Sequence, residues 1–230
     1  MAESNRAYHG DAGRIFAARA GADGLNALHE RPAVLTLIGD VDGLDVADLG
    51  CGAGHLAAIL STSGARVTGV EGSSVLAQIA THAAPAAAIV HHDLDLPLTF
   101  LADDSQDGVV CALVIHHLDD RQRFLGEVRR ILRPGGWLVL STTHPTADWG
   151  YFGGSYFDER WVTRALGEAT MEYRHMTMST VINEIIDAGF TVERMVEPQP
   201  IEAMRALAPE RYERLRADPI FVVVRARADK

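Results

Sequence analysis

Short apolar runs alternate with amphipathic segments along the middle of the chain, between about residues 44 and 140. The runs are rich in Val, Ile and Leu and are four to seven residues long, which is typical of strands buried on both faces of a parallel sheet. The predicted strands are 45–49, 66–70, 88–91, 108–114 and 137–141, followed by a later pair at 190–196 and 220–225.

The segments between these runs carry helix signals. In 121–132 the apolar residues recur at i, i+1, i+4, i+7 and i+8, so they share one helical face, and Pro134-Gly135 ends the helix. Further helices are expected at 55–62, 74–82, 179–188 and 201–216, the last interrupted at Pro209. Residues 1–40 are predicted to be mostly helical, and 146–176 to form an irregular, aromatic-rich insertion. Strands that alternate with helices predict an α/β fold with a doubly wound sheet.

Composition and charge narrow the class of protein. The 230 residues are 47% hydrophobic and 23% charged, which is typical of a globular chain. The longest apolar run, 109–115, falls far short of the roughly 20 residues that span a bilayer, and no secretory signal is visible, so a cytoplasmic protein without a membrane partner is expected. Asp and Glu outnumber Lys and Arg by 31 to 21, so nucleic acid is not an expected partner. Cys51 and Cys111 are isolated, so no metal site is expected.

The strongest local signal is a glycine-rich turn between the strand at 45–49 and the helix at 55–62. Gly50, Gly52 and Gly54 occupy every second position, so the backbone can turn tightly and approach a ligand without a Cβ atom in the way. The spacing is G-x-G-x-G, and not the G-x-G-x-x-G of dinucleotide-binding proteins. The alternative interpretation is a tight turn that binds no ligand.

Two carboxylates flank this turn. Asp48 lies two residues before the first glycine, where it would repel a pyrophosphate but attract an ammonium group. Glu71 ends the next strand, 21 residues after Gly50, where its oxygens can accept hydrogen bonds from ribose hydroxyls, unless it is a solvated strand end. Together these residues predict a nucleoside ligand that carries a positive charge and no phosphates.

At these residues the chain resembles the class I S-adenosylmethionine-dependent methyltransferases, in particular their small-molecule, type 11-like branch. The resemblance covers about 46–143 and rests on DLGCGAGHL, VTGVEGS, HHDLDLPL, DGVVCALVIHHLDD and RRILRPGGWLVLSTTHP. It implies a Rossmann-like, mostly parallel, seven-stranded sheet with helices on both faces, with S-adenosyl-L-methionine as cofactor and S-adenosyl-L-homocysteine as product. It also implies a single domain with four parts: an N-terminal helical cap (1–43), a cofactor-binding core (44–145), an acceptor-side insertion (146–178) and a C-terminal helix with the late strands (179–230).

The resemblance further implies which residues contact the cofactor. The expected set is Asp48, Gly50, Cys51, Gly52, Gly54, Glu71, Gly72, Ser73, Asp93, Leu94 and Leu113. The glycines and Asp48 would contact the methionine part, Glu71 the ribose with Ser73 nearby, Asp93 and Leu94 the adenine, and the Leu113 backbone the amino group. Asp95 is an alternative to Asp93, and either carboxylate is alternatively a turn residue that hydrogen-bonds its own backbone.

The acceptor is expected beyond the carboxyl ends of the fourth and fifth strands, where ligands bind in open α/β sheets. His117 and His144 lie there, and an imidazole is suited to remove a proton from a hydroxyl, an amine or an activated carbon. Alternatively, His117 shapes the pocket, and His144 is a turn residue fixed by Pro145. A base is optional, because alignment with an activated methyl group supplies much of the rate.

Six of the fifteen aromatic residues lie within the 13 positions 149–161. Because glycines flank them, we expect a lid that forms the acceptor pocket through Trp149, Tyr151 and Tyr156. The alternative is that these aromatics only cover the sheet. The N-terminal stretch around Tyr8 and Phe16 is a candidate for closing the other side of the cofactor, and 173–175 is a further acceptor-side candidate.

These features predict methyl transfer to a small-molecule acceptor by in-line displacement at the sulfonium methyl group, in a monomer or a homodimer. O-, N- and C-methylation all stay open, although the fourth strand ends in CALVIHHL and lacks the N-P-P-Y or D-P-P-Y signature of enzymes that methylate DNA amino groups. Two alternatives are carried along. One is an NAD(P)-dependent oxidoreductase, which shares the sheet but not the glycine spacing, and the other is a non-catalytic S-adenosylmethionine-binding protein.

Overall fold

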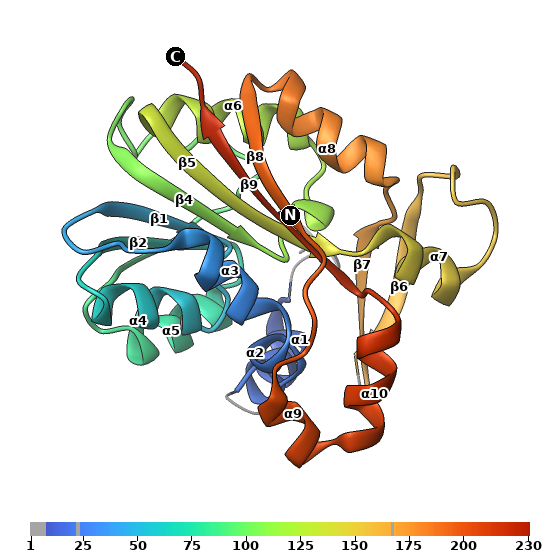
Figure 1. The fold of residues 1–230 in the computed structure, drawn as a ribbon. Coiled ribbons are helices and arrows are strands. Elements are labelled where there is room, and N and C mark those ends of the chain that lie inside the picture. Colours follow the sequence, from blue (N-terminus) through green and yellow to red (C-terminus); the bar gives the residue numbers. More distant parts are fainter. Residues whose placement is uncertain (1–7, 22–23, 167) are drawn as a thin grey trace.

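A twisted seven-stranded sheet runs through the molecule, as the computed structural model of residues 8–21, 24–166 and 168–230 shows (Figure 1). In spatial order its strands are β3 (Ala88–His91), β2 (Arg66–Glu71), β1 (Asp45–Leu49), β4 (Gln106–Ala112), β5 (Leu132–Thr143), β9 (Phe221–Ala228) and β8 (Phe190–Val196). Neighbouring strands from β3 to β5 are parallel, whereas β9 runs antiparallel to both β5 and β8. The predicted doubly wound, mostly parallel sheet is confirmed.

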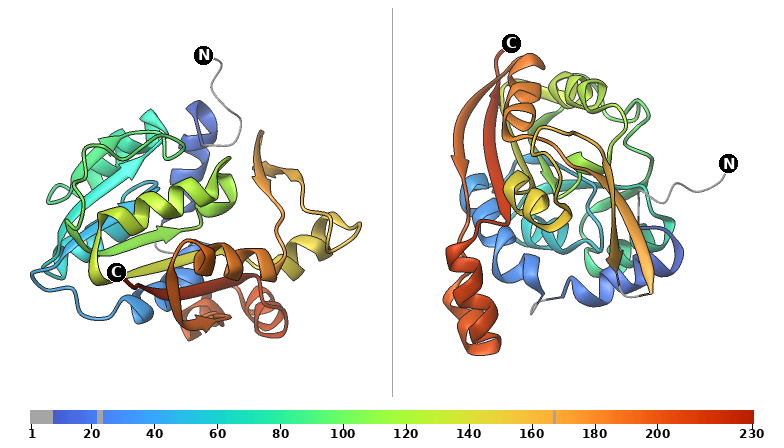
Figure 2. Two further views of the ribbon diagram at one scale, coloured as in Figure 1. Left: turned by 90° about the horizontal axis from the view of Figure 1, so that it is seen from above. Right: turned by 90° about the vertical axis from the view of Figure 1, so that its right-hand side faces the viewer.

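Alternate residues of the central strands are buried in two apolar clusters, one on each face of the sheet. In β4, for example, Val109 belongs to one cluster and Val110 to the other. Helices α6 (Arg121–Ile131) and α8 (Met178–Asp187) cover the first face, and α3 (Glu30–Ile38) and α4 (His55–Thr62) cover the second, with α5 (Ser74–Ala83) beside α4 (Figure 2). Because 109–111 in β4 and 138–140 in β5 are buried on both sides, their sequences are unbroken apolar runs, which made these strands predictable.

Several strand boundaries differ from the prediction, and those of β4 and β5 have a visible structural cause. β4 ends at Ala112 and not at Val114, because Leu113 has a φ of 58° and turns the chain into the short helix η1 (Ile115–His117). β5 begins at Leu132, directly after α6, and its pairing with β4 shifts register before Trp137. The Pro134-Gly135 turn is therefore taken up within an irregular first part of β5.

The segment 146–176, predicted to be irregular, is largely regular, so that prediction is wrong. It contains α7 (Pro145–Phe152) and an antiparallel hairpin of β6 (Trp161–Leu166) and β7 (Ala169–Arg174), which stands apart from the main sheet (Figure 1). Buried Val162 and Tyr173 pair across the hairpin, and the next pair consists of polar Thr163 and Glu172. Such mixed strands lack the apolar run that marks the main sheet.

Four helices gather at the same end of the molecule as the hairpin: α1 (Gly10–Arg19), α2 (Leu25–Leu28), α9 (Glu202–Leu207) and α10 (Pro209–Ala217) (Figure 1). Leu28, Met204, Tyr212 and Leu215 form a small apolar cluster that joins α2 to α9 and α10. The N-terminal and C-terminal parts of the chain are thereby brought together beside the carboxyl ends of the parallel strands.

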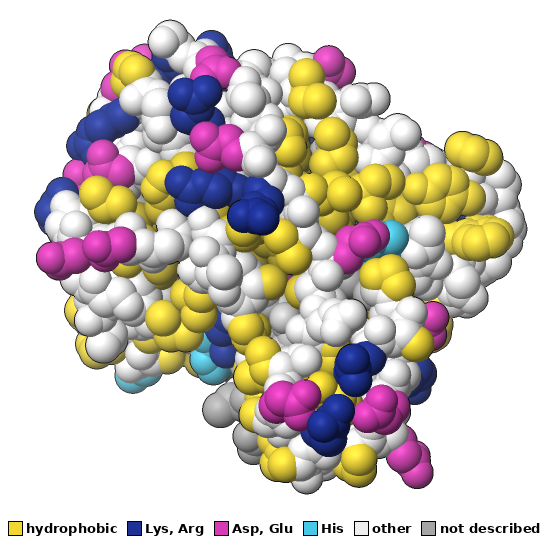
Figure 3. Space-filling view, viewed as in Figure 1, with side chains coloured by type: hydrophobic (Ala, Val, Ile, Leu, Met, Phe, Trp, Pro, Cys, Tyr) yellow, Lys and Arg dark blue, Asp and Glu magenta, His cyan; other side chains and the backbone are white. Residues whose placement is uncertain are grey.

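The surface mixes charges of both signs. On the face seen in Figure 3, Lys and Arg side chains are interspersed with Asp and Glu, and several form ion pairs, such as Arg205 with Glu202 at 3.1 Å. None of the helices in the described ranges combines the length and the apolar character that crossing a bilayer requires.

Candidate functional site

A cavity of about 860 Å³ opens beyond the carboxyl ends of β1, β2 and β4. Its walls come from the glycine turn, the N-terminal helices, η1, the β6–β7 hairpin and α10. Of the residues predicted from the sequence, those that line it are Asp48, Gly50, Cys51, Gly52, Glu71, Gly72, Asp93, Leu94, Leu113 and His117. The fold thus brings most of the predicted cofactor residues and one predicted histidine to a single cavity.

The three glycines of the turn have different structural requirements. Gly50, Gly52 and Gly54 have φ values of 80°, 57° and 83°, a region that side chains disfavour. A Cβ atom on Gly50 would lie 2.2 Å from a methyl group of Val114, and one on Gly54 would lie 2.9 Å from Cα of Ala80. Gly54 therefore serves the packing of α4 against α5, whereas Gly50 and Gly52 line the cavity itself.

Asp48 is a buried acid that faces the cavity without a full set of partners. Its side chain is 1% exposed, and Oδ2 has no hydrogen-bond partner among the described residues. Burial, with a smaller contribution from the Glu71 carboxylate, raises the pKa of Asp48 to about 7. An unpartnered carboxylate oxygen in such a place fits a ligand that carries a positive charge.

Glu71 ties the glycine turn to the start of α5. Its Oε2 accepts a hydrogen bond from the Gly52 N–H at 2.8 Å, and its Oε1 accepts one from the Ser73 N–H at 2.8 Å. Ser73 does not line the cavity but caps α5, since its Oγ accepts from the Leu76 N–H. Glu71 is 8% exposed, so it is not a solvated strand end, and burial raises its pKa. Each carboxylate oxygen keeps acceptor capacity for a ligand hydroxyl.

Both aspartates after β3 line the cavity and both also stabilise the local backbone. Asp93 Oδ1 accepts from the Asp95 N–H at 2.9 Å, which is the turn contact expected as the alternative interpretation. Asp95 Oδ1 accepts from the N–H groups of Asp119 and Asp120 at 3.0 and 3.1 Å. Asp95 therefore joins this loop to the one before α6, while Asp93 lies beside buried Leu94 at the cavity wall.

A hydrogen-bonded chain that the sequence did not reveal supports Leu113. The Leu113 N–H donates to the Ser141 carbonyl oxygen at 3.1 Å and to Ser141 Oγ at 3.0 Å, and Ser141 Oγ donates to Glu30 Oε1. Burial raises the pKa of Glu30 to about 7. Ser141 and Glu30 are 111 residues apart, so no local pattern could have paired them.

Arg31, like its neighbour Glu30, lies at the start of α3 and was not predicted from the sequence. It lines the cavity, and one of its guanidinium N–H groups donates to the Ala20 carbonyl oxygen at 3.3 Å. Asp48 and Glu30 both act on it electrostatically. The cavity end nearest the glycine turn therefore offers a carboxylate and a guanidinium together, which fits the two charges of an amino acid group.

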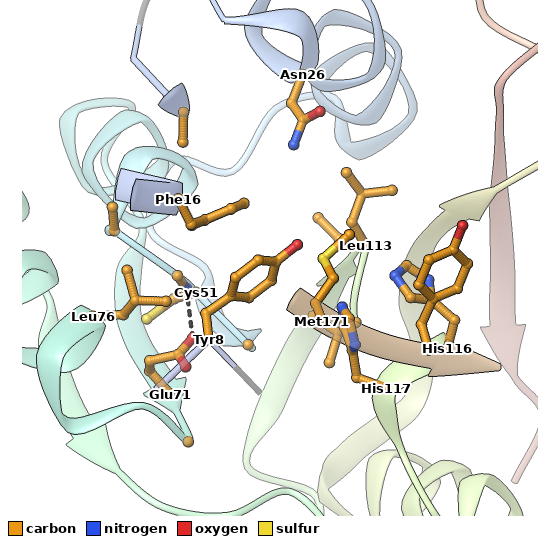
Figure 4. A pocket seen from close by; sticks show the side chains of 18 of the residues that line it. Tyr8, Phe16, Asn26, Cys51, Glu71, Leu76, Leu113, His116, His117 and Met171 are labelled. Atoms are coloured by element: carbon orange, nitrogen blue, oxygen red, sulfur yellow. Dashed lines mark hydrogen bonds between the residues drawn. The ribbon is translucent and has the colours of Figure 1, made fainter. Parts of the chain in front are cut away.

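His117 lines the cavity and has one ring nitrogen without a partner among the described residues. Its Nδ1 lies 3.1 Å from the Glu172 carbonyl oxygen, which can only accept, so Nδ1 carries the hydrogen and Nε2 is the acceptor. Nε2 is buried without a partner in the described part of the chain. Burial lowers the pKa of His117 to about 4, so the ring is neutral near pH 7. Tyr8 lies between Glu71 and His117, with its ring edge-on to the His117 ring at a centroid distance of 5.6 Å (Figure 4).

The other predicted acceptor residues lie elsewhere. His144 is 4% exposed, contacts Glu197 Oε1 through Nε2 at 2.8 Å and caps α7, and it is not among the residues that line the cavity. Trp149, Tyr151 and Tyr156 do not line it either. The insertion reaches the cavity through its hairpin, with Arg164, Ala165, Met171 and Tyr173. Phe16 and Tyr8 also line the cavity, with Tyr8 between Glu71 and His117 (Figure 4).

Comparison with known proteins assigns the family. A model described as a methyltransferase domain matches residues 47–140. The solved structure of an S-adenosylmethionine-dependent methyltransferase from Mesorhizobium loti is 30% identical, with a TM-score of 0.72, over 90% of this chain and 100% of the other. The chain belongs to the S-adenosylmethionine-dependent methyltransferases. The predicted family, fold and cofactor are thereby confirmed, with S-adenosylhomocysteine as the cofactor product, and the structure gives no support to an oxidoreductase.

Two further relatives of this methyltransferase are named for their activities. A ubiquinone biosynthesis O-methyltransferase of Bradyrhizobium is 32% identical over 138 residues, which are 58% of this chain and 52% of that enzyme. The 1,6-didemethyltoxoflavin-N1-methyltransferase of Burkholderia thailandensis, solved with its acceptor and S-adenosylhomocysteine, shares the fold with a TM-score of 0.60 and 21% identity, over 87% of this chain and 78% of that one. The match to the first spans about half of that enzyme's length.

Proposed function

We propose that this methyltransferase transfers a methyl group to an oxygen or nitrogen atom of a small-molecule acceptor inside the cavity. The observation that carries the proposal is the His117 Nε2 atom, a buried acceptor without a partner in the described residues, at the end of the cavity away from the glycine turn. An acceptor with an O–H or N–H group would donate to this atom. The cavity volume of about 860 Å³ supports an acceptor of small size.

The cofactor residues take the following roles in this proposal. Asp48 attracts the ammonium group, and Arg31 attracts the carboxylate of the methionine part. Glu71, oriented by the Gly52 and Ser73 N–H groups, accepts from the ribose hydroxyls. Asp93 and Leu94 border the adenine, and 44–145 forms the cofactor-binding core between an N-terminal cap and an acceptor-side insertion.

The catalytic contribution of the chain is alignment. The bound cofactor supplies a methyl group on a positively charged sulfur, already activated for displacement. His117 Nε2 accepts the acceptor's hydrogen bond and so turns a lone pair of the reacting atom toward that methyl group. A neutral imidazole with a pKa of about 4 is a weak base, so its part is to orient the acceptor, and the proton leaves to His117 or to water as the new bond forms.

The relatives favour this class of acceptor. The Bradyrhizobium enzyme is an O-methyltransferase, and the Burkholderia fold relative is an N1-methyltransferase solved with a small heterocycle. Both names describe methylation of a heteroatom on a small molecule. His144, Trp149, Tyr151 and Tyr156 have no place in the proposed site, because none of them lines the cavity.

Calorimetric titration tests the cofactor half of the proposal. We expect saturable binding of S-adenosylmethionine and S-adenosylhomocysteine, no binding of NAD or NADP, and loss of binding in Glu71→Ala. Glu210→Ala, which removes an exposed carboxylate outside the cavity, serves as the control and should bind like the wild type. Binding that survives in Glu71→Ala would contradict the assigned site.

Turnover tests the catalytic half. Incubation with radiolabelled S-adenosylmethionine and a library of small phenols, hydroxy acids and heterocyclic amines should give a labelled product and S-adenosylhomocysteine. His117→Ala should lower kcat by about tenfold to a hundredfold, since it removes one orienting hydrogen bond. A binding-competent protein that labels no member of the library would instead favour a non-catalytic cofactor-binding protein.

A further inference from the structure

The charges around the cavity are unevenly distributed. The carboxylates Asp48, Glu71 and Asp93 lie at the ends of β1, β2 and β3, on the side of the glycine turn. The opposite wall, formed by the β6–β7 hairpin, contributes a cation, Arg164, together with Met171 and Tyr173. Met171 of this wall lies beside His117 in Figure 4, so the wall borders the part of the cavity assigned to the acceptor.

Arg164 has no carboxylate at ion-pair distance within the described ranges, although the chain carries a net charge of −10. Asp148, which influences the hairpin electrostatically, is already engaged, since its oxygens accept from Thr143 Oγ1 at 2.6 Å and from the Tyr173 hydroxyl at 3.0 Å. The Arg164 guanidinium also interacts with that Tyr173 hydroxyl. Its remaining N–H groups have no acceptor among the residues that the structure describes.

The guanidinium is held in place from outside the cavity. Its central carbon lies over the ring of Tyr151, 5.0 Å from the ring centroid. A guanidinium that stacks by its face keeps its N–H edge available for a bidentate partner. Tyr151 thus supports the Arg164 guanidinium but does not line the cavity itself.

The same hairpin also fixes His117. The Glu172 carbonyl oxygen that sets the His117 tautomer belongs to the residue after Met171, and Met171 is the cross-strand partner of Arg164. The hairpin therefore contributes a cation to the cavity wall and also sets the tautomer of His117. Arg31, in contrast, lies at the cofactor end, near Asp48 and Glu30.

We propose, building on the proposed methyl transfer, that the acceptor carries a carboxylate group that binds to Arg164 while its O–H or N–H group faces His117 Nε2. The acceptor is then a small molecule that carries a carboxylate and, separately, the hydroxyl or amine group that is methylated. Because the Arg164 side chain is exposed, a neutral acceptor would leave its N–H edge to water, whereas a carboxylate would add a charge-assisted contact.

Matched pairs of neutral and anionic probes test the proposal. Benzoate and benzamide, phenylacetate and phenylacetamide, and 4-hydroxybenzoate and 4-hydroxybenzamide are titrated into the protein saturated with S-adenosylhomocysteine, and binding is followed by ligand-observed NMR. We expect each carboxylate to bind about tenfold more tightly than its amide, since Arg164 is exposed and contributes one charge-assisted contact. Arg164→Gln should abolish the preference, and Arg164→Lys should restore part of it.

The control is Arg194→Gln, which removes the charge of an exposed arginine outside the cavity and should keep the preference. The cavity wall holds a second cation, Arg211 of α10. The proposal is overturned by equal affinity for both members of each pair, by binding of neither, by a preference that survives in Arg164→Gln, or by one that is lost in Arg211→Gln instead. The saturation step separates the two proposals. Failure of S-adenosylhomocysteine to bind the wild type contradicts the assigned cofactor site, whereas binding without carboxylate preference contradicts the acceptor class alone.

Discussion

At the scale of single residues, the cavity holds carboxyl groups that burial makes hard to ionise. Asp48 is 1% exposed and Glu30 is 2% exposed, and burial raises the pKa of each to about 7. An unfolded carboxyl group loses its proton near pH 4, so between about pH 4 and pH 7 the folded protein binds more protons than the unfolded chain. The contribution of these groups to stability is present in full below about pH 4 and is lost as the pH rises to about 7.

Asp48→Asn isolates this effect. We predict that it stabilises the cofactor-free protein relative to the wild type by more at pH 8 than at pH 5, with a difference on the order of 2 kcal/mol, because the amide is neutral at both pH values. Urea unfolding at the two pH values measures it, and Asp187→Asn, at an exposed position in α8, should show no such difference. An equal effect at both pH values would show that Asp48 is ionised throughout this range.

At the scale of elements, the glycine turn depends on the packing of α4 against α5. We predict that Gly54→Ala destabilises the protein by about 2 kcal/mol, because it combines a φ of 83° with a Cβ atom 2.9 Å from Ala80 Cα. Gly126→Ala is the matched control, since Gly126 lies within α6 with no atom near the added methyl group, and it should stabilise by about 0.5–1 kcal/mol. Thermal unfolding of the two variants should shift in opposite directions, and parallel shifts would contradict the account.

The same scale shows why most elements were predictable and one was not. The central strands are buried on both faces and the helices on one, so their hydrophobic periodicity is strong; α4 begins and ends at the predicted residues 55 and 62. The β6–β7 hairpin pairs Arg164 with Met171 and Thr163 with Glu172, a mixture without clear period. The hairpin packs against η1 and closes the cavity there. These are tertiary contacts, which a local sequence pattern does not predict.

At the scale of the whole molecule, the two ends of the cavity differ in how far the sequence could define them. The cofactor end is built from residues at the ends of consecutive parallel strands, so short motifs identify Asp48, Gly50 and Glu71 in advance. The acceptor end joins distant segments, as the contact between His117 and Glu172, 55 residues apart, illustrates. His117 was found because it follows a strand, whereas Arg164 could be placed only by the fold.

Because the cavity walls come from distant segments of the chain, we expect cofactor binding to affect several of these segments at once. Tyr8 lies against Phe16, with ring centroids 4.3 Å apart, and against His117, so it connects α1 to η1 across the cavity. We predict that S-adenosylhomocysteine slows amide hydrogen exchange in α1, η1 and the β6–β7 hairpin, because a ligand bound to the folded state suppresses local opening of the walls that it contacts. Exchange in α8, on the covered face of the sheet, should change little.

Tyr8→Ala tests whether Tyr8 provides the connection. It should keep the slowing of exchange in the glycine turn at 50–54 and lose most of it in α1, because the aromatic contact that links α1 to the opposite wall is gone. Phe157→Ala, which removes a ring that is 81% exposed, is the control and should respond to the ligand like the wild type. If exchange in the wild type slowed only at 50–54, α1 would not respond to the cofactor. The predicted role of Tyr8 in linking α1 to η1 would then be wrong.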